Sequence, residues 1–368
     1  MPEQKYIKPS KVKELPPELS YEPLMSELAA AHAAVGELRG FLGAIPNPDL
    51  LIAPFRKKEA VASSAIEGTR ATLEEVLKYE ALDESNANPE KDELTRKVQD
   101  IKEVMNYERA MAVALRELKE RPIGEVLMKR THAVLLDSVR GTSKDRGNFR
   151  REQVRVGDYI PPIHTEITDL IKNWEKYLNT NTNERDVLVR IGVAHYQFEA
   201  IHPFLDGNGR IGRLIIPLFL CQEEVLPTPV LFISDFLEEH KVEYQRLLHK
   251  VDTDQEWINW LKFFLKAVEV QAKKTTAMAK EIQGLYEAMK GDVITNIRSH
   301  HAISLLDAIF KSPVITAGNV STILKAKSKG TTYNLLNKFV EEGILREVPG
   351  PSRESLYVFS ELLRVLRV

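Results

Sequence analysis

The twelve residues from His202 to Arg213, HPFLDGNGRIGR, combine side-chain types that packing alone rarely requires. One imidazole, one carboxylate, three glycines and two arginines lie here between the apolar segments AHYQFEAI and LIIPLFL. The sequence Gly207-Asn208-Gly209 can turn successive backbone N–H groups into one concavity, which is a common anion site. The apolar periodicity that follows predicts a helix whose positive end lies at the same place. Together these features indicate a site for phosphate groups.

The charged side chains of this stretch refine that prediction. Arg210 and Arg213 are three residues apart, so both guanidinium groups can lie on one helix face and bind phosphate oxygens. Asp206 precedes the glycines, and its charge would repel an anion, so it fits a Mg²⁺ ligand better than a phosphate contact. The predicted ligand is therefore a metal-chelated polyphosphate. The Walker sequence GxxxxGK(S/T) is absent.

Two histidines lie close to this stretch. His202 is expected to follow a helix, four residues before Asp206. A neutral imidazole there could take a proton from an attacking hydroxyl or return one to a leaving group. A lone histidine is more often a capping or core residue, but the neighbouring glycines, carboxylate and arginines favour the base. His195, two helical turns earlier, is expected to be structural.

Helical periodicity dominates the chain and must supply the elements that position these groups. Helices are expected over residues 21–41, 54–67, 72–79, 94–118, 122–138, 165–178 and 186–200. Gly68 is a natural residue to follow the end of the second helix. Thr72 and Glu75 form the pattern of a capping box, which opens the third.

Residues Gln153–Ile160, QVRVGDYI, break the helical pattern. Two short alternating runs flank Gly157-Asp158, which is typical of a hairpin, and Pro161 ends the second run. Two interpretations stay open at this point. The hairpin is either a surface decoration or a flap that adds an extended peptide as a further strand.

The sequence beyond Val270 predicts a connecting helix, then three helices and the two strands ILREV and SLYVF. This order is typical of a winged helix-turn-helix, with residues 331–342 in place of the recognition helix. Residues 293–368 carry ten basic and six acidic side chains. This excess permits phosphate contact, but winged helices also bind proteins, so DNA as a partner stays open.

Composition limits the class of protein. The net charge is −2, with 43% hydrophobic and 28% charged residues, which is typical of a globular chain without general attraction to nucleic acid or anionic lipid. No apolar run approaches the roughly 20 residues of a membrane helix, and the polar N-terminal segment does not resemble a signal peptide. The one cysteine, Cys221, excludes an internal disulfide and is expected to be a buried hydrophobe. These features predict a cytoplasmic protein that does not bind a membrane.

The stretch HPFLDGNGRIGR is similar to the signature of the Fic family, HxFx(D/E)GNGRxxR, at every defined position. The resemblance extends upstream to RGNFRREQVRVGDYIPP, which is similar to the family's substrate-positioning flap, and downstream to FLEEHKVEYQRLL. It covers most of the chain and implies a mainly α fold. An N-terminal helical region over 1–110 would precede a Fic core with a β-hairpin flap over 111–270 and a winged helix over 290–368.

Fic proteins mostly transfer AMP from ATP to a protein hydroxyl, so the resemblance implies ATP as substrate and Mg²⁺ as cofactor. It makes His202 the base that deprotonates a Ser, Thr or Tyr of the target, places Phe204 in the core, and makes Asp206 the Mg²⁺ ligand. The nucleotide-binding residues that it implies are Gly207, Asn208, Gly209, Arg210, Ile211, Gly212, Arg213 and Tyr244. The flap residues are Val154, Arg155, Val156 and Tyr159. Many relatives carry a second tyrosine where this chain has Gln245, a departure at the expected base pocket.

Glu67 is expected at the carboxyl end of its helix, where the helix dipole disfavours an anion by about 0.3–1 kcal/mol. The segment Ser63–Gly68, SSAIEG, is similar to the Fic inhibitory motif (S/T)xxxE(G/N). In the family this glutamate pairs with the last arginine of the signature, here Arg213. The resemblance thus implies that Glu67, with Ser63, removes a γ-phosphate clamp and misplaces ATP.

Three functions remain open from the sequence. The first is an autoinhibited protein adenylyltransferase that modifies a target protein or itself. The second is the reverse reaction, removal of AMP by water that Glu67 orients. The third is a DNA-binding regulator whose Fic core senses nucleotide. A homodimer is compatible with each of them.

Overall fold

The computed structural model describes residues 9–45, 47–83, 93–137, 145–180, 186–325, 328–350 and 354–367. The chain forms two compact units. The first unit comprises the described residues of 1–40, 62–68 and 106–273, and the second those of 41–61, 69–105 and 274–368. The division at residues 110, 270 and 290 stays a prediction.

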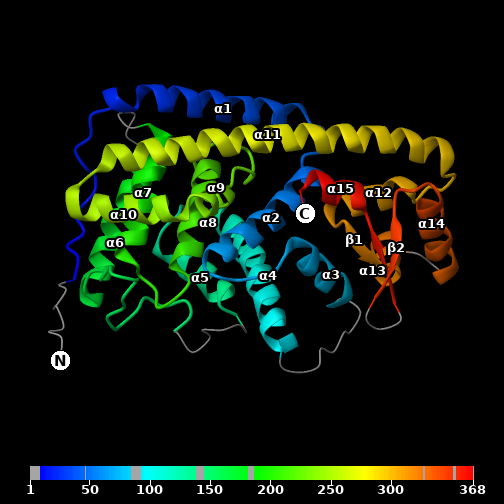
Figure 1. Cartoon of the computed structure of the whole chain (residues 1–368), viewed down its shortest axis with the longest axis horizontal. Helices are drawn as coiled ribbons and strands as arrows, with labels where there is room; N and C mark the ends of the chain where they lie inside the picture. The colour runs from blue at the N-terminus through cyan, green and yellow to red at the C-terminus, as the bar shows by residue number, and fades with distance from the viewer. Residues whose placement is uncertain are drawn as a thin grey trace. The chain divides into compact units, whose positions relative to one another are not determined.

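The chain is mainly α-helical, as the sequence predicts (Figure 1). The helices of the described ranges are η1 Glu22–Leu24, α1 Met25–Ala44, α2 Asp49–Ile66, α3 Leu73–Asp83, α4 Glu93–Leu118, α5 Glu125–Leu135, η2 His164–Glu166, α6 Ile167–Asn179, α7 Val187–Ile201, α8 Asn208–Gln222, α9 Ser234–Glu239, α10 Lys241–Asp254, α11 Trp257–Asn296, α12 Ala302–Lys311, α13 Ala317–Leu324, α14 Lys329–Glu341 and α15 Ser360–Val365. The strands are β1 Val314–Thr316, β2 Arg346–Pro349 and β3 Ser355–Val358. No described helix has both the length and the apolar character needed to cross a membrane.

Helix α2 begins earlier than the sequence predicts. It starts at Asp49 rather than Pro54, and Pro54 lies inside it, although a proline there removes a backbone hydrogen bond. It ends at Ile66, and Gly68 follows with φ of 95°, as expected for a residue just beyond a helix. The predicted capping box is confirmed, since Thr72 N donates to Glu75 Oε2 at 3.1 Å and Glu75 N donates to Thr72 Oγ1 at 3.3 Å.

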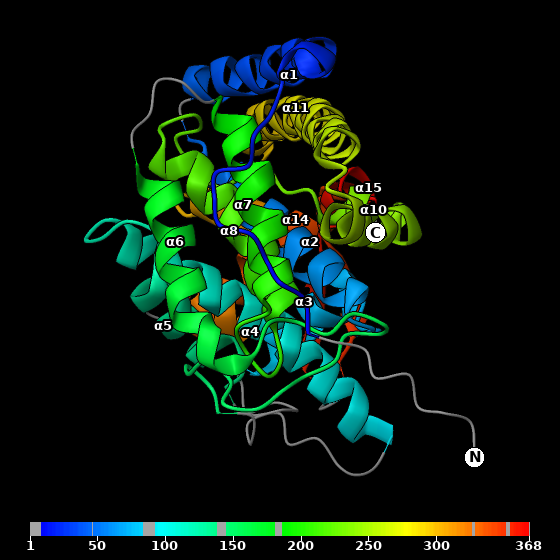
Figure 2. The ribbon, with the colours of Figure 1, turned by 90° about the vertical axis from the view of Figure 1, so that its left-hand side faces the viewer.

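Helices α6, α7 and α8 lie side by side in the first unit and form its core (Figures 1 and 2). The sequence of α7 is mostly apolar, and nearly the whole helix is buried, its polar residues Arg190, His195 and Gln197 included. Two tryptophan indoles bind its backbone: Trp174 Nε1 of α6 donates to Ala194 O at 2.8 Å, and Trp260 Nε1 of α11 donates to Gly192 O at 2.9 Å. These bonds fix the helix that leads into the signature.

The predicted hairpin is present but small. Its turn lies at Gly157, with φ of 57°, and its pairing is the single bridge between Val156 and Tyr159. Pro161 ends the second run, because proline lacks an N–H for a further pair. On the outer side of the second run, Ser10 N donates to Ile160 O at 2.8 Å, so the N-terminal segment occupies that edge.

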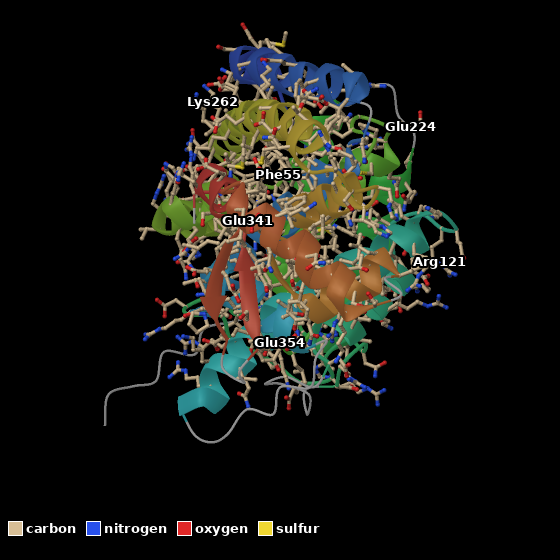
Figure 3. The ribbon with its side chains drawn as sticks, turned by 90° about the vertical axis from the view of Figure 1, so that its right-hand side faces the viewer. Phe55, Arg121, Glu224, Lys262, Glu341 and Glu354 are labelled. Carbon is tan, nitrogen blue, oxygen red and sulfur yellow. The ribbon has the colours of Figure 1, made fainter. Side chains whose placement is uncertain are left out.

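The C-terminal part of the second unit contains α12, α13 and α14, followed by β2 and β3, as expected. A further strand, β1, was not predicted, because three residues after Pro313 are too short for an alternating pattern. It pairs antiparallel with β3, and the sheet order is β1-β3-β2. Glu341 ends α14 and Glu354 precedes β3 (Figure 3). Membership of the winged-helix class, and contact with DNA, stay predictions.

The packing of α7 against α11 makes Gly192 a position where a side chain is costly. A Cβ there would lie 2.9 Å from Phe264 Cδ1 and 3.1 Å from Leu261 Cδ2. We expect Gly192→Ala to lower the free energy of unfolding by about 1–3 kcal/mol, because both neighbours are buried and must shift. Chemical denaturation measures the change.

The matched control is Gly36→Ala in α1, where nothing lies within 4 Å of the added Cβ. That change should raise stability by about 0.5–1 kcal/mol, since alanine favours a helix interior. Equal effects of the two substitutions would contradict this account of the α7–α11 contact.

Candidate functional site

The signature residues form a closed loop between α7 and α8. His202 follows α7 in the left-handed conformation, with φ of 50°, and Gly207, with φ of 75°, precedes α8. The buried side-chain amide of Asn208 spans the loop: Phe204 N donates to its Oδ1 at 2.8 Å, and its Nδ2 donates to Phe204 O at 2.9 Å. Asn208 therefore shapes the loop with its side chain and can offer a ligand only its backbone N–H.

His132 of α5 packs against this loop and forms a hydrogen bond with its backbone. Its ring stacks on Phe204 with centroids 3.9 Å apart, and its Nε2 donates to Asp206 O at 3.0 Å. Its Nδ1 accepts the Gly147 N–H at 2.8 Å, so both ring nitrogens are used by the neutral form. Burial lowers the pKa of His132 to about 4, which keeps it neutral. The sequence around it, MKRTHAVL, gives no signal of this role.

Arg150 ties the loop to the base of the flap. Its side chain is buried, with 2% of the residue exposed, and it donates to main-chain carbonyls. Nε binds His202 O at 2.9 Å, Nη1 binds Glu152 O at 3.0 Å, and Nη2 binds Pro162 O at 2.6 Å. This guanidinium fixes the backbone of the candidate base. The sequence places Arg150 only within the segment that is similar to the flap, and nothing in it indicates this contact with the signature loop.

His202 is half-buried at the end of α7. Its Nδ1 lies 3.4 Å from Glu199 O, a long contact in which Nδ1–H is the donor, so the lone pair of Nε2 is left to accept a proton. Burial lowers the pKa of His202 to about 4, and the charge of Arg150 contributes to the shift. The imidazole is therefore neutral at pH 7, the form that a general base requires.

A carboxylate lies at the start of α8, where anions are favoured. The first N–H groups of a helix have no partner within the helix. Gly209 leaves room above them, because a Cβ on it would lie only 2.3 Å from Glu67 Oε1. Glu67 thus lies over the glycine that the sequence assigns to phosphate binding.

The same carboxylate pairs with Arg213. Nη2 of Arg213 donates to Glu67 Oε1 at 2.7 Å and to Ser63 O at 2.8 Å, and Nε donates to Ser63 Oγ at 2.9 Å. Only 3% of Arg213 is exposed, whereas 41% of the Glu67 side chain is. Burial raises the pKa of Glu67, but the charge of Arg213, the hydrogen bond from Arg213 and the charge of Arg210 together hold the pKa below its usual 4.5. The structure therefore brings together the residues that the inhibitory motif predicts.

Lys241 explains how a glutamate can directly follow α2. It stands at the start of α10, and its Nζ donates to Ile66 O at 2.5 Å. An ammonium group at the carboxyl end of a helix offsets the dipole that disfavours Glu67 there. This contact, which the sequence does not reveal, fixes the end of α2 beside the signature.

Asp206 and Arg210 occupy the other side of the loop. Asp206 Oδ1 accepts the Gly207 N–H at 2.7 Å and lies 3.7 Å from Nη2 of the buried Arg210. Within the described ranges, no three His, Cys, Asp or Glu side chains gather to hold a metal ion by themselves. Mg²⁺ commonly takes one protein carboxylate and completes its shell with water and substrate phosphates. The partly exposed Asp206 fits that arrangement, with a metal ion that arrives on a polyphosphate.

Three of the residues considered in the sequence, His195, Ile211 and Tyr244, are buried and contribute to packing around α8. His195 Nδ1 donates to Gly212 O at 3.1 Å, and the Tyr244 hydroxyl donates to His195 Nε2 at 2.9 Å. His195 is thus placed as a structural residue. Tyr244 and Ile211 are buried, so the hydroxyl of Tyr244 faces the core and only its ring could border a base. In the flap, the Tyr159 hydroxyl donates to Ala200 O at 2.8 Å, whereas Val154, Arg155 and Val156 are partly or fully exposed.

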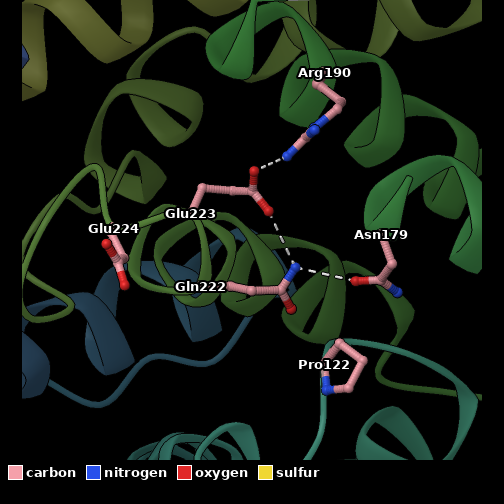
Figure 4. A pocket seen from close by; sticks show the side chains of 6 residues that line it. All are labelled: Pro122, Asn179, Arg190, Gln222, Glu223 and Glu224. Carbon is pink, nitrogen blue, oxygen red and sulfur yellow. Dashed lines mark hydrogen bonds and ion pairs between the residues drawn. The ribbon is translucent and has the colours of Figure 1, made fainter. Parts of the chain in front are cut away.

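A hollow of about 430 Å³ lies at the opposite end of α7 and α8 (Figure 4). Arg190 and Glu223 form an ion pair in it, and Gln222 Nε2 donates to Asn179 Oδ1 at 3.1 Å. Pro122 and Glu224 complete its lining. None of the residues that the sequence predicts for the site lies there. Nearby, Cys221 is half-buried rather than fully buried as expected.

The buried histidines predict how stability depends on pH. Burial lowers the pKa values of His132, His195 and His202 to about 4, below the usual 6.5. Between these values the unfolded chain binds more protons than the folded one, so the free energy of unfolding falls as pH falls. Each histidine should account for a loss on the order of 3 kcal/mol from pH 7 to below pH 4. Thermal unfolding across this range measures the slope.

Two variants separate this effect from general acid sensitivity. His132→Gln removes one titrating ring and should reduce the slope by about a third of the histidine contribution. His249→Gln changes an exposed histidine of α10 and should leave the slope unchanged. An unchanged slope in His132→Gln would show that its ring does not titrate as described.

The models of two known family regions match parts of this chain. Residues 25–116 match the model of the Fic/DOC family N-terminal region, and residues 122–220 match the model of the Fic/DOC family. The second range contains His132, Arg150 and the whole signature. Together the two matches span half of the chain.

Curated relatives and solved structures agree with these matches. The chain is 27% identical to the protein adenylyltransferase Fic of Drosophila grimshawi over 164 residues, which are 43% of this chain and 32% of that protein. It is 40% identical to the Drosophila melanogaster protein of the same name over 77 residues, 21% of this chain and 16% of that one. The chain thus spans a third or less of these relatives.

Two crystal structures share the fold. A Fic family protein from Desulfovibrio desulfuricans has a TM-score of 0.56 and 21% identity, and the match covers 94% of this chain and 98% of that one. A Fic domain containing signaling protein from Bacteroides thetaiotaomicron has a TM-score of 0.54 and 18% identity, with 69% and 95% covered. With the family matches and the signature loop, these findings show that the chain belongs to the Fic/DOC family.

Proposed function

We propose that the chain is an autoinhibited protein adenylyltransferase, which transfers AMP from ATP to a Ser, Thr or Tyr hydroxyl of a target protein, itself included. The observation that carries the proposal is the arrangement of His202 beside the start of α8. A neutral imidazole with a free lone pair lies next to a helix end that carries two buried arginines. Relatives named protein adenylyltransferase support the choice of reaction.

The start of α8 supplies the phosphate contacts in this proposal. The backbone N–H groups of Asn208 and Gly209 bind phosphate oxygens, and the guanidinium groups of Arg210 and Arg213 bind the β- and γ-phosphates. Asp206 would hold a Mg²⁺ ion, which would neutralise charge on the phosphates. Arg210 and Arg213 are both buried, so they are already placed and desolvated before ATP binds.

The transfer step follows from this placement. Nε2 of His202 takes the proton of the target hydroxyl, and the oxygen forms a bond to the α-phosphorus. The bond from that phosphorus to the oxygen that bridges the α- and β-phosphates breaks, and pyrophosphate leaves with the charge. The N–H groups of α8 and the two arginines stabilise the leaving group. Arg150 holds the His202 backbone, so the base keeps its position through the reaction.

Glu67 inhibits the reaction by taking the place of a phosphate. Its carboxylate lies over Gly209 and binds Nη2 of Arg213, two contacts that a γ-phosphate would otherwise make. ATP that binds despite this is displaced from the position for in-line attack. Because Glu67 is held by the end of α2, which Lys241 binds, inhibition is relieved when this end moves.

The decisive experiment uses ATP labelled at the α-phosphate, Mg²⁺ and the Glu67→Gly protein. We expect label on the protein itself or on a protein of a cell lysate. The label should be absent from Glu67→Gly/His202→Ala, because that variant keeps the phosphate contacts and lacks the base. The unchanged chain should label at least about tenfold less than Glu67→Gly, because it lacks a free γ-phosphate site.

The reverse reaction is tested in the same material. Glu67 is ionised and 41% of its side chain is exposed, so it can accept a proton from water. If Glu67→Gly labels no protein, whereas the unchanged chain releases AMP from a protein modified at a hydroxyl, the chain removes AMP. That result would replace the transferase proposal.

The flap predicts how the target is held. Ser10 occupies the edge of the flap at Ile160, and alternate residues of a strand direct their backbone groups to opposite edges. Since Val156 bonds to Tyr159 inside the hairpin, Arg155 presents its N–H and C=O on the free outer edge. In the Glu67→Gly background, Arg155→Pro should lower target labelling about tenfold, because proline lacks the N–H for an added strand.

Arg155→Ala is the matched control, since it removes the same side chain and keeps the N–H. It should label targets about as well as its parent, and both variants should bind ATP equally. An equal loss in Arg155→Ala would assign recognition to the side chain and reject main-chain pairing at this edge.

A further inference from the structure

Glu199 is a carboxyl group that the proposed chemistry does not use. It lies in the last turn of α7, three residues before His202. Its Oε1 is buried and has no hydrogen-bond partner among the described residues. Buried polar atoms nearly always have such a partner, so this oxygen requires an explanation.

Glu199 lies against Gly212 of α8, and the charge of the neighbouring Arg213 acts on it. Gly212 immediately precedes Arg213, and a Cβ on it would lie 2.2 Å from Glu199 Oε1. The lack of a side chain at Gly212 thus makes room for this carboxyl group. The charged and titratable groups that face it are Arg213 from α8, Glu67 from the end of α2, Tyr244 from α10 and His195 from α7.

These neighbours determine the charge of Glu199. Burial raises the pKa of Glu199 to about 7, the charge of Arg213 lowers it, and the charge of Glu67 raises it. While Glu67 binds Arg213, Glu199 is therefore partly protonated near neutral pH. When Glu67 leaves, the group that raises this pKa is gone, and a buried guanidinium has lost its partner. Both changes favour an ionised Glu199, since a buried charge without a partner is costly.

We propose that Glu199 is a positioning residue for Arg213, a second carboxylate that balances the buried guanidinium whenever neither Glu67 nor a phosphate does so. Glu199 releases its proton to solvent when Glu67 leaves. It takes one up again when a nucleotide brings phosphate charge to Arg213. This keeps the guanidinium in place between the inhibited and the nucleotide-bound states. The inference rests on the proposed function in one respect only, namely that the ligand whose binding returns a proton to Glu199 is a nucleotide.

The first test needs no nucleotide. NMR follows the side-chain carboxyl carbons of protein labelled with carbon-13 glutamate, and the resonance missing from Glu199→Gln identifies Glu199. We expect the pKa of Glu199 to be near 7 in the unchanged chain and to fall by roughly one pH unit or more in Glu67→Gly. Glu120→Gln, which changes an exposed carboxylate, should leave the Glu199 titration as it is. Equal pKa values with and without Glu67 would overturn the proposal.

The second test measures protons during binding. Calorimetry of Mg²⁺ and ATP binding to Glu67→Gly at pH 6.5, in buffers of different protonation enthalpy, should show an uptake of roughly half a proton per site that Glu67→Gly/Glu199→Gln lacks. A purely structural role would weaken binding equally at each pH and leave the proton uptake the same in both proteins, which would also overturn the proposal. If ATP does not bind at all, the proposed function fails, whereas the titration without nucleotide still decides the role of Glu199.

Discussion

The buried positive charge of Arg213 is the constraint on which the rest of the site depends. A guanidinium that is 3% exposed must be matched by an anion, because desolvating a lone charge is costly. Its partners in this chain come from the end of α2, where Ser63 and Glu67 bind it, and the charge of Glu199 of α7 also acts on it. A phosphate would meet the same need. Several groups therefore compete for one guanidinium, that of Arg213, which makes an intramolecular switch possible.

Hydrogen bonds to backbone atoms supply the rigidity that this competition requires. His132, Asn208 and Arg150 bind backbone atoms of the loop between α7 and α8, and the first two carry no charge at neutral pH. The loop is thus held by groups that do not change when Glu67 or a ligand comes and goes. The charged groups can exchange partners on a backbone that stays where it is.

Much of this arrangement can be predicted from the sequence, and the reason is local. The glycines, arginines and His202 lie within twelve consecutive residues, so their spacing alone indicates a phosphate site and a base. The pairing of Glu67 with Arg213 was predictable only through a resemblance, since 146 positions separate the two residues. Nothing in the sequence singles out His132, Arg150 or Lys241, because each acts through a contact with a distant segment, and no motif marks Glu199 although it lies close to the signature. The early start of α2 and the strand β1 were missed because a proline and a three-residue run obscure the usual patterns.

Gly209 has a consequence for how such a chain can evolve. The space above it is used by Glu67 and, in the proposed function, by the phosphate that replaces it. Any side chain at this position would exclude both, so a substitution there cannot release the inhibitor while preserving the catalyst. Arg213 is shared in the same way. A lineage that needs a permanently active protein must therefore change the end of α2 or the contact of Lys241 that holds it, and inherited variation in constitutive activity should be concentrated there.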